Sequence, residues 1–396
     1  MMKNICLFLF LLCIGNAGIA QMQPIKIKFD PENMRESDKG LSAFIESIEY
    51  IPLETTDECV IDKGMVFDYD DTHIIVKDNT CKSAYLFDRE GNFQRTIGST
   101  GGGPNEFVDG IHCVYLDEDN HTIVAGTLGK ALCFNKKGEI LWTTVFPKNE
   151  DRSIIAYFQG KFLRSRNSYY FPDSVYPVYT LYDQTAHLLK EAVPSLRMPP
   201  LKNKQWRISF ATRHIVPVYM YQNMLHVREY LNDTVYKING LNQFIPKYVF
   251  DLGKYKVTPE IQTDIEHFAD KTYNKVIIAE IIETSQVLLI QYYYKGTIRC
   301  CYYDKNDKRL YSFDSLGYPN DYDGGVNFVL NWSRGQKNRF AQTSFSAEEF
   351  LSLFEQCQKE KRPVRGPQSA VRAFEKLVKK VDPDDNPIIM IVKLKE

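Results

Sequence analysis

A short pattern of hydrophobic and polar positions recurs along the chain. It consists of a hydrophobic residue, Asp or Asn, two polar residues and a glycine-type turn, followed by a run rich in β-forming residues. The pattern occurs as Phe87-Asp88-Arg89-Glu90-Gly91, Phe134-Asn135-Lys136-Lys137-Gly138 and Tyr182-Asp183-Gln184-Thr185-Ala186, with weaker echoes at Tyr236 to Gly240 and Tyr303 to Asp307. The first three copies are 47 and 48 residues apart. This period is typical of the four-stranded blades of a β-propeller.

Short strand-like runs fill each repeat. In the first repeat they lie at about 64–69, 73–77, 84–87 and 93–97, with turns at Asp70-Asp71 and Glu90-Gly91. Similar units follow at about 107–146, 153–193, 207–252 and 285–316, and an irregular sixth begins with strands expected at 327–331 and 339–345. The fold class predicted is therefore all-β, a six-bladed β-propeller.

A few helices interrupt the repeats. The first is expected to begin at Thr258-Pro259, with an Ile261, Ile265 and Phe268 stripe that we interpret as packing. Residues 346–361 are expected to form a second helix, which Ser346 and Glu349 would cap, and 369–381 a third.

The two ends of the chain are expected to close the ring. Residues 21–44 are predicted to form an extended lead-in and 45–396 the propeller. A closed ring needs a strand from one terminus in the blade made by the other, because closure protects exposed strand edges. The runs at 45–53 and 388–394 are the expected pair.

The first 20 residues resemble a signal peptide. Lys3 is followed by an apolar run, and Gly18-Ile19-Ala20 places small residues at a cleavage position, so the mature chain is expected to begin at Gln21. Cys13 follows Leu12 rather than the small residue of a lipoprotein signal, which disfavours a lipid anchor but leaves it as an alternative. The prediction is an exported protein of the periplasm or cell surface.

Composition narrows the class of partner. A formal net charge of −1 gives no electrostatic reason to expect nucleic acid, and no later stretch approaches the roughly 18 apolar residues of a transmembrane helix. We expect a monomer. Removal of the leader leaves seven cysteines, an odd number whose spacings match no small disulfide scaffold, so buried thiols are favoured.

Four segments resemble a known family. In chain order they are Tyr50-Ile51-Pro52-Leu53-Glu54, Gly101-Gly102-Gly103-Pro104-Asn105-Glu106-Phe107, Asn232-Asp233-Thr234-Val235-Tyr236, and Asn386-Pro387-Ile388-Ile389-Met390 with Leu394-Lys395. In that order they resemble the exported six-bladed β-propeller proteins of Bacteroidetes, over essentially the whole mature chain. The resemblance implies a fold and an exported location but no catalytic residues. Many members of that family carry a lipoprotein signal, from which the context of Cys13 departs.

The loop from Gly98 to Glu106 is the first candidate for a ligand site. Its glycines Gly101, Gly102 and Gly103 would let backbone amides approach a ligand, and Pro104 would stiffen the turn that presents Asn105 and Glu106. No Gly-Lys-Ser/Thr follows, so it is not a nucleotide-binding loop. A structural blade connection is the alternative interpretation.

Two aromatic and basic pairs are weaker candidates. Trp206 with Arg207, and Trp332 with Arg334, could line a sugar or peptide site, although such pairs also occur as rim packing. Several acidic clusters could supply oxygen ligands to calcium, but their spacing fits turns better than a calcium loop: Asp68 with Asp70 and Asp71, 117–120, Asp321 with Asp323, and 382–386.

The sequence therefore favours a binding or scaffold module for a glycan, a peptide or an envelope protein, by analogy with other propellers. No cofactor is expected, with calcium left as an alternative, and no catalytic motif is recognisable. The alternative function is a calcium-dependent hydrolase or lyase, lactonase-like, with its site at the central channel.

Overall fold

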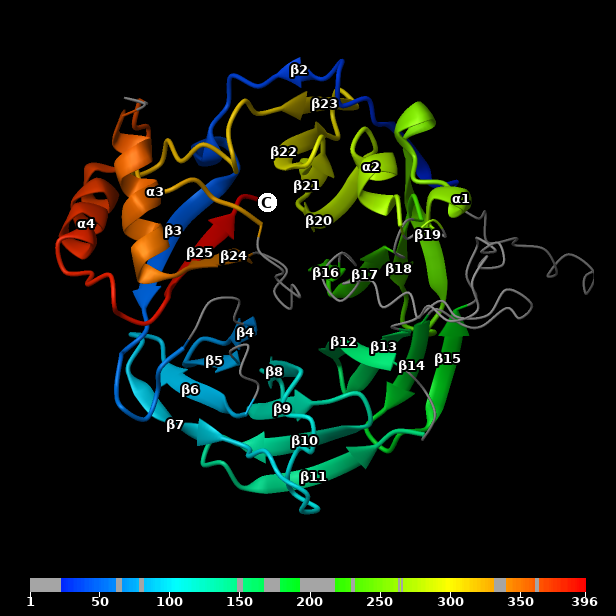
Figure 1. Cartoon of the computed structure of the whole chain (residues 1–396), viewed down its shortest axis with the longest axis vertical. Coiled ribbons are helices and arrows are strands. Elements are labelled where there is room, and N and C mark those ends of the chain that lie inside the picture. The colour runs from blue at the N-terminus through cyan, green and yellow to red at the C-terminus, as the bar shows by residue number, and fades with distance from the viewer. Residues whose placement is uncertain are drawn as a thin grey trace, which may run out of the picture.

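The computed structural model describes residues 23–61, 66–77, 82–147, 152–166, 179–192, 218–228, 232–262, 264, 266–330, 340–359 and 363–396. In this part of the chain six sheets surround a central axis (Figure 1). Five of these sheets contain an antiparallel meander of four consecutive strands, and the sixth has three antiparallel strands. The six-bladed β-propeller is confirmed.

The first three blades follow the predicted repeats closely. Blade one contains β4 (Val66–Tyr69), β5 (His73–Lys77), β6 (Ala84–Asp88) and β7 (Phe93–Ile97). Blade two contains β8 (Cys113–Asp117), β9 (Thr122–Gly126), β10 (Lys130–Asn135) and β11 (Ile140–Val145). Blade three contains β12 (Arg152–Phe158), β13 (Lys161–Arg166), β14 (Tyr179–Asp183) and β15 (Leu188–Ala192).

Blades four and five each carry an additional outer strand. Blade four contains β16 (Val218–Tyr221), β17 (Met224–Arg228), β18 (Thr234–Ile238) and β19 (Phe244–Asp251), and β1 (Ile25–Lys28) pairs in parallel with β19. Blade five contains β20 (Ile277–Glu283), β21 (Val287–Tyr294), β22 (Thr297–Asp304) and β23 (Arg309–Ser312), and β2 (Arg35–Glu36) pairs in parallel with β23. Blade five therefore begins earlier than the predicted 285.

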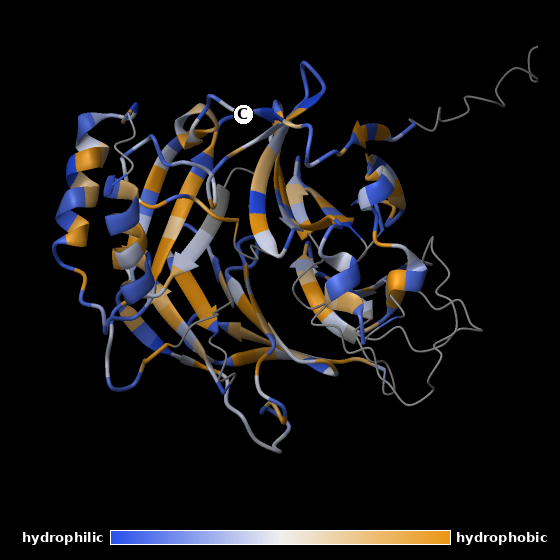
Figure 2. Cartoon of the chain, turned by 45° about the horizontal axis from the view of Figure 1, so that its top comes forward, coloured by the Kyte–Doolittle hydropathy of each residue, from blue (hydrophilic) through white to orange (hydrophobic). Residues whose placement is uncertain are grey.

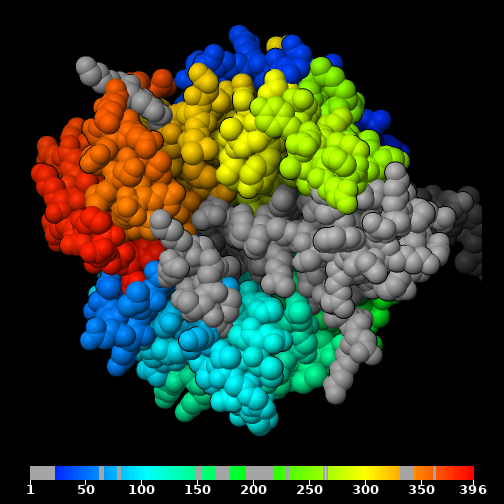
Figure 3. All heavy atoms as spheres, viewed as in Figure 1, coloured from blue at the N-terminus to red at the C-terminus, as the bar shows by residue number. Residues whose placement is uncertain are grey.

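The predicted lead-in thus lies along the outer edges of two blades. Figure 3 shows its dark blue atoms on the rim beside the yellow atoms of blade five. The carboxylate of Glu32 fastens it there by accepting hydrogen bonds from the hydroxyls of Tyr255 (2.8 Å) and Tyr294 (2.7 Å). These contacts lower the pKa of Glu32 to about 2. A short 3-10 turn, η1 (Leu41–Ala43), then leads into β3.

Blade six unites the two ends of the described chain. β25 (Ile388–Leu394) lies between β24 (Phe340–Phe345) and β3 (Ile45–Pro52) and is antiparallel to both. The segments expected to pair from the sequence are therefore neighbouring strands. The strand predicted at 327–331 is wrong, because within 327–330 only Phe328 makes an isolated bridge, to Tyr318.

The predicted helices exist with different lengths. α3 (Ala347–Lys359) and α4 (Gln368–Val378) lie beside β3 on the outside of blade six (Figure 1). The hydroxyl of Ser346 accepts from the amide of Glu349 at 3.2 Å, as expected for the cap. The helix expected after Thr258 is broken into α1 (Pro259–Gln262) and α2 (Phe268–Thr272), which follow the 3-10 turn η3 (Gly253–Tyr255).

Hydrophobic side chains fill the spaces between all neighbouring blades. Alternate residues of one strand face opposite neighbours: on β9, Ile123 and Ala125 pack against blade one, whereas Val124 packs against blade three. Because both faces of a blade are covered, its middle strands are apolar in continuous runs rather than alternating. Figure 2 shows these apolar positions on the strands. The prediction of buried thiols is confirmed for five described cysteines: Cys59, Cys113, Cys133, Cys300 and Cys301. Cys357 is partly exposed, and Cys81 lies outside the described residues.

The recurring sequence pattern forms a hydrogen-bonded turn. Oδ1 of Asp88 accepts from the amides of Glu90 (3.0 Å) and Asn92 (2.8 Å), and Gly91 has a positive φ of 90°. Asn135, Asp183 and Asn239 form the same turn. Oδ1 of each accepts hydrogen bonds from the backbone amides two and four residues after it. The fourth copy therefore begins at Ile238, two residues later than the echo at Tyr236. Asx turns of this kind explain why Asp or Asn is required at the position.

Candidate functional site

The connections between strands lie on two opposite faces of the ring. Because blades one to five are antiparallel meanders, the turn between the first and second strands of each shares a face with the turn between its third and fourth strands. We call this the turn face; in blade five it contains residues 284–286 and 305–308. The loops that lead from one blade to the next, including residues 98–112, lie on the other face, the loop face.

The glycine-rich loop on the loop face is held together by its own hydrogen bonds. The carboxylate of Glu106 accepts from the amide of Gly103 at 2.8 Å, and the amide of Gly101 donates to the carbonyl of Phe107 at 3.1 Å. The ammonium of Lys130 donates to the carbonyls of Pro104 (2.5 Å) and Glu106 (2.7 Å).

Much of this loop is exposed to solvent. The exposed residues are Ser99, Thr100, Gly102, Pro104 and Asn105, whereas Phe107, which follows the loop, is buried between blades one and two. The amides expected to meet a ligand at Gly101 and Gly103 thus have partners within the loop. A ligand role for Gly101, Gly102, Gly103, Pro104, Asn105 and Glu106 stays a prediction. The other candidates, Trp206, Arg207, Trp332 and Arg334, lie outside the described residues.

Asp70, from one of the acidic clusters, binds the amides of its own turn and a lysine of the neighbouring blade. Asp70 accepts from the amides of Thr72 (2.8 Å) and His73 (2.7 Å), and from the ammonium of Lys136 in blade two at 2.5 Å. Burial raises the pKa of Asp70, but Lys136 and the turn amides lower it below its ordinary value overall. In the described ranges no group of three or more His, Cys, Asp or Glu side chains is placed to hold a metal ion.

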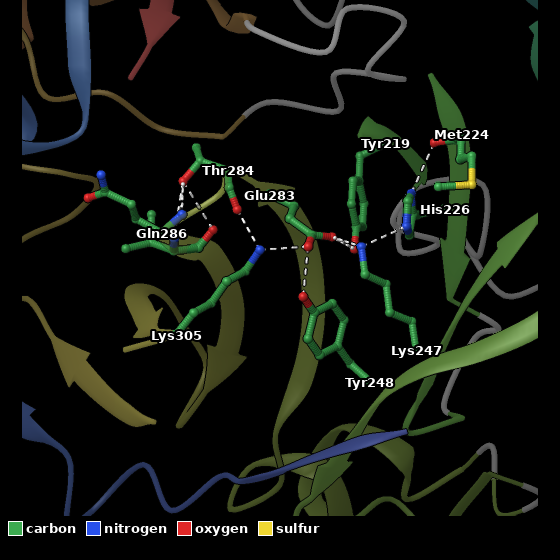
Figure 4. A network of polar contacts seen from close by, with 10 residues as sticks. Tyr219, Met224, His226, Lys247, Tyr248, Glu283, Thr284, Gln286 and Lys305 are labelled. Atoms are coloured by element: carbon green, nitrogen blue, oxygen red, sulfur yellow. Dashed lines mark hydrogen bonds and ion pairs between the residues drawn. The ribbon is translucent and has the colours of Figure 1, made fainter. Parts of the chain in front are cut away.

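A denser polar cluster lies on the turn face between blades four and five. Its centre is Glu283 at the end of β20, whose side chain is fully buried. The two lysines approach Glu283 from opposite sides (Figure 4). Lys247 of β19 donates at 2.9 Å and Lys305, which follows β22, donates at 2.7 Å. We call these groups, with Tyr219, Tyr221, His226 and Tyr248, the Glu283 cluster.

The carboxylate of Glu283 accepts as many hydrogen bonds as its two oxygens can hold. The hydroxyl of Tyr219 donates to Oε2 at 3.1 Å and that of Tyr248 donates to Oε1 at 2.7 Å, so each oxygen accepts two hydrogen bonds. A carboxylate has about four lone-pair sites. Burial raises the pKa of Glu283, but Lys247 and Lys305 lower it overall. Glu283 is therefore an anion that organises its neighbours.

His226 orients one of the lysines. Its Nδ1 lies 3.0 Å from the carbonyl of Met224, and its Nε2 lies 3.1 Å from Nζ of Lys247. The carbonyl can only accept, so Nδ1 carries the proton and Nε2 accepts from Lys247. Burial, together with the charge of Lys247, lowers the pKa of His226 to about 4. The imidazole is therefore neutral near pH 7.

The exposed side of the cluster is formed by the lysines and Tyr221. The side chains of Lys247 and Lys305 are 19% and 18% exposed. Their ammonium groups lie 4.5 and 4.8 Å from the centre of the Tyr221 ring, which is partly exposed. Two cations thus share one aromatic ring and one carboxylate. The charged groups of this set carry a net charge of +1.

The sequence analysis missed this cluster. Its members are spread from Tyr219 to Lys305, and blade packing rather than spacing brings them together. One signal was available: Lys305 occupies the same position of the recurring pattern as Lys136, which contacts Asp70 across a blade boundary.

Comparison with known proteins establishes the family. The family model described as "Domain of unknown function (DUF4934)" matches residues 24–393. The chain belongs to the DUF4934 family. No curated protein matches this DUF4934 member.

A solved structure shares the fold of this DUF4934 protein. A "putative exported protein" of Bacteroides fragilis is similar with a TM-score of 0.64 and 17% identity, over 94% of this chain and 100% of that one. A member of the DUF4221 family from Bacteroides vulgatus has a TM-score of 0.49 and 12% identity, over 89% of this chain and 97% of that one. The predicted resemblance to exported Bacteroidetes propellers is confirmed at the level of fold and family. No helix among the described residues is long and apolar enough to span a membrane.

Proposed function

We propose that this DUF4934 protein is an exported binding module of the periplasm or cell surface, and that its ligand binds on the turn face at the Glu283 cluster. The ligand classes are those expected from the sequence: a glycan, a peptide or an envelope protein. The observation that carries the proposal is the pairing of two ammonium groups with one saturated carboxylate beside a partly exposed aromatic ring.

A structural role alone would need fewer groups. Between blades one and two, a comparable contact has only one lysine: Lys136 pairs with Asp70 and lies 3.4 Å from Nδ1 of His73. The cluster between blades four and five adds a second lysine and places both cations by Tyr221. Glu283 neutralises only one of the two lysines, and like charges held close together raise the free energy unless a further counter-ion approaches. The additional cation therefore supports ligand binding.

The test is a screen of glycan and peptide arrays with the mature protein and two matched variants. Lys305→Met removes a cation from the cluster, and Lys136→Met removes the equivalent lysine between blades one and two. We expect a ligand that binds wild type and Lys136→Met but is lost with Lys305→Met, while both variants remain folded by circular dichroism. A ligand retained equally by both variants would contradict the proposed site.

Calcium forms a further arm of the screen, because the lactonase-like alternative is open. Stabilisation by calcium alone, with turnover of a lactone substrate, would replace the binding proposal by that alternative. Fractionation of cells that express the full chain tests the export proposal, which requires recovery outside the cytoplasm and loss of the first 20 residues.

A further inference from the structure

We infer that the chemical group held at the Glu283 cluster is a carboxylate monoanion. The inference rests on the proposed function and specifies its ligand. It follows from the charge of the site and from the hydrogen-bond donors that the site leaves available.

The charge of the site favours a monoanion. Lys247 and Lys305 carry two positive charges and Glu283 carries one negative charge, while His226 is neutral. Two further groups act on the cluster from nearby: Lys237 on Lys247, and Glu396 on Tyr221. These two groups have opposite signs. A carboxylate would neutralise the remaining positive charge, whereas a phosphate dianion would reverse it and a neutral ligand would leave it unpaired.

The available donors suit an oxygen anion. An ammonium group has three N–H donors. Within the described chain, Lys247 directs donors to Glu283 and His226, and Lys305 directs donors to Glu283 and the carbonyl of Thr284. Each lysine therefore has a donor left. The hydroxyl of Tyr221 makes no hydrogen bond to any described residue, and its ring lies beside both ammonium groups.

A carboxylate can come from a sugar acid or from an amino acid, and the two share the same recognition chemistry. We propose isothermal titration of the mature protein at pH 7.5 with glucuronate, N-acetylglutamate, glucose and inorganic phosphate. Wild type, Tyr221→Phe, Lys305→Met and Lys136→Met would be compared. Tyr221→Phe removes only a hydroxyl without a described partner, so it should leave thermal stability unchanged.

We expect glucuronate or N-acetylglutamate to bind and glucose not to bind. Tyr221→Phe should weaken the affinity for the carboxylate ligand about tenfold, because a hydrogen bond to a charged group is lost. Lys305→Met should abolish binding, and Lys136→Met should leave it unchanged. Tighter binding of glucuronate would assign the carboxylate to a sugar acid, and tighter binding of N-acetylglutamate to an amino acid.

Other outcomes separate this inference from the proposed function. If glucose binds as tightly as glucuronate, and Lys305→Met abolishes its binding, the inference that the ligand is a carboxylate would be overturned. The proposed binding site would then be retained. Phosphate that binds more tightly than both carboxylates would do the same. A silent titration would overturn the carboxylate alone if the array screen yields a ligand sensitive to Lys305→Met, and would overturn both proposals if that screen is silent as well.

Discussion

The ammonium of Lys136 in blade two lies 2.5 Å from the carboxylate of Asp70 in blade one. This contact joins the turn that follows the third strand of one blade to the turn that follows the first strand of its neighbour. Lys305 occupies the same position of the recurring pattern, but it contacts Glu283 of its own blade, which also binds Lys247 of the preceding blade. One position of the repeat thus serves two different arrangements on the turn face.

Glu283→Ala should be the most damaging change in the cluster. It leaves two lysines and the hydroxyls of Tyr219 and Tyr248 without their shared acceptor, and breaking a buried ion pair costs about 3 kcal/mol or more. Urea unfolding measures the loss. The matched control is Glu49→Ala, which removes the partly exposed partner of Arg89 and should cost less than about 1 kcal/mol. Equal costs for the two changes would refute a central role for Glu283.

Acid should destabilise the protein through His226. Its pKa is about 4 in the folded chain, against an ordinary value of 6.5, so the unfolded chain binds more protons between these values. The contribution of the neutral His226 to the free energy of unfolding is therefore fully present above pH 6.5. It falls as the pH drops toward 4, by on the order of 3 kcal/mol. Glu283, whose pKa is lowered, acts in the same direction below its ordinary value. Unfolding curves between pH 7.5 and 4 measure the slope.

The control for this pH effect is His226→Gln. Its amide does not titrate, so the fall in stability between pH 6.5 and 5 should become smaller in the variant. An unchanged slope in that interval would show that other groups carry the acid sensitivity.

Ring closure should make one repeated glycine more sensitive than another. Gly91 and Gly138 occupy the same position of the recurring turn, with φ of 90° and 85°. A Cβ at Gly91 would lie 2.1 Å from the carbonyl oxygen of Pro52 in the closing blade, whereas at Gly138 the nearest atom is 3.6 Å away. We expect Gly138→Ala to cost about 1 kcal/mol from backbone strain, and Gly91→Ala roughly 3 kcal/mol from strain and overlap. Similar costs in urea unfolding would argue against this contact between blades.

The glycine-rich loop permits a test of its internal packing. A Cβ at Gly101 would meet the carboxylate of Glu106 at 2.2 Å, whereas a Cβ at Gly102 would meet nothing within 4 Å. Gly101→Ala should therefore displace Glu106 from the amide of Gly103 and cost about 1.5 kcal/mol, and Gly102→Ala should be close to neutral.

A double variant checks the cause of the Gly101 effect. In Glu106→Ala the overlapping carboxylate is absent, so a further Gly101→Ala change should cost much less. Thermal unfolding of the four proteins measures this coupling, and simple additivity would contradict the proposed contact.

Local features of the chain were readable without the structure. The recurring turn needs Asp or Asn to bind amides within four residues, and the strands around it need β-forming residues, so period, strand positions and blade number were predictable. The closing strand 388–394 was predicted with its observed bounds. Errors arose where local signals were weak: the first strand of blade five begins at Ile277, and the helix expected after Thr258 divides in two.

The sequence by itself determined the blades and their recurring turns, because these depend on hydrogen bonds and side-chain alternation within about 50 residues. Only the tertiary structure decided that the lead-in covers blades four and five, and that Tyr221, Lys247, Glu283 and Lys305 meet. Their contacts depend on how neighbouring blades pack. In the chain, these residues stand 26 to 84 positions from Tyr221, and no spacing rule connects them.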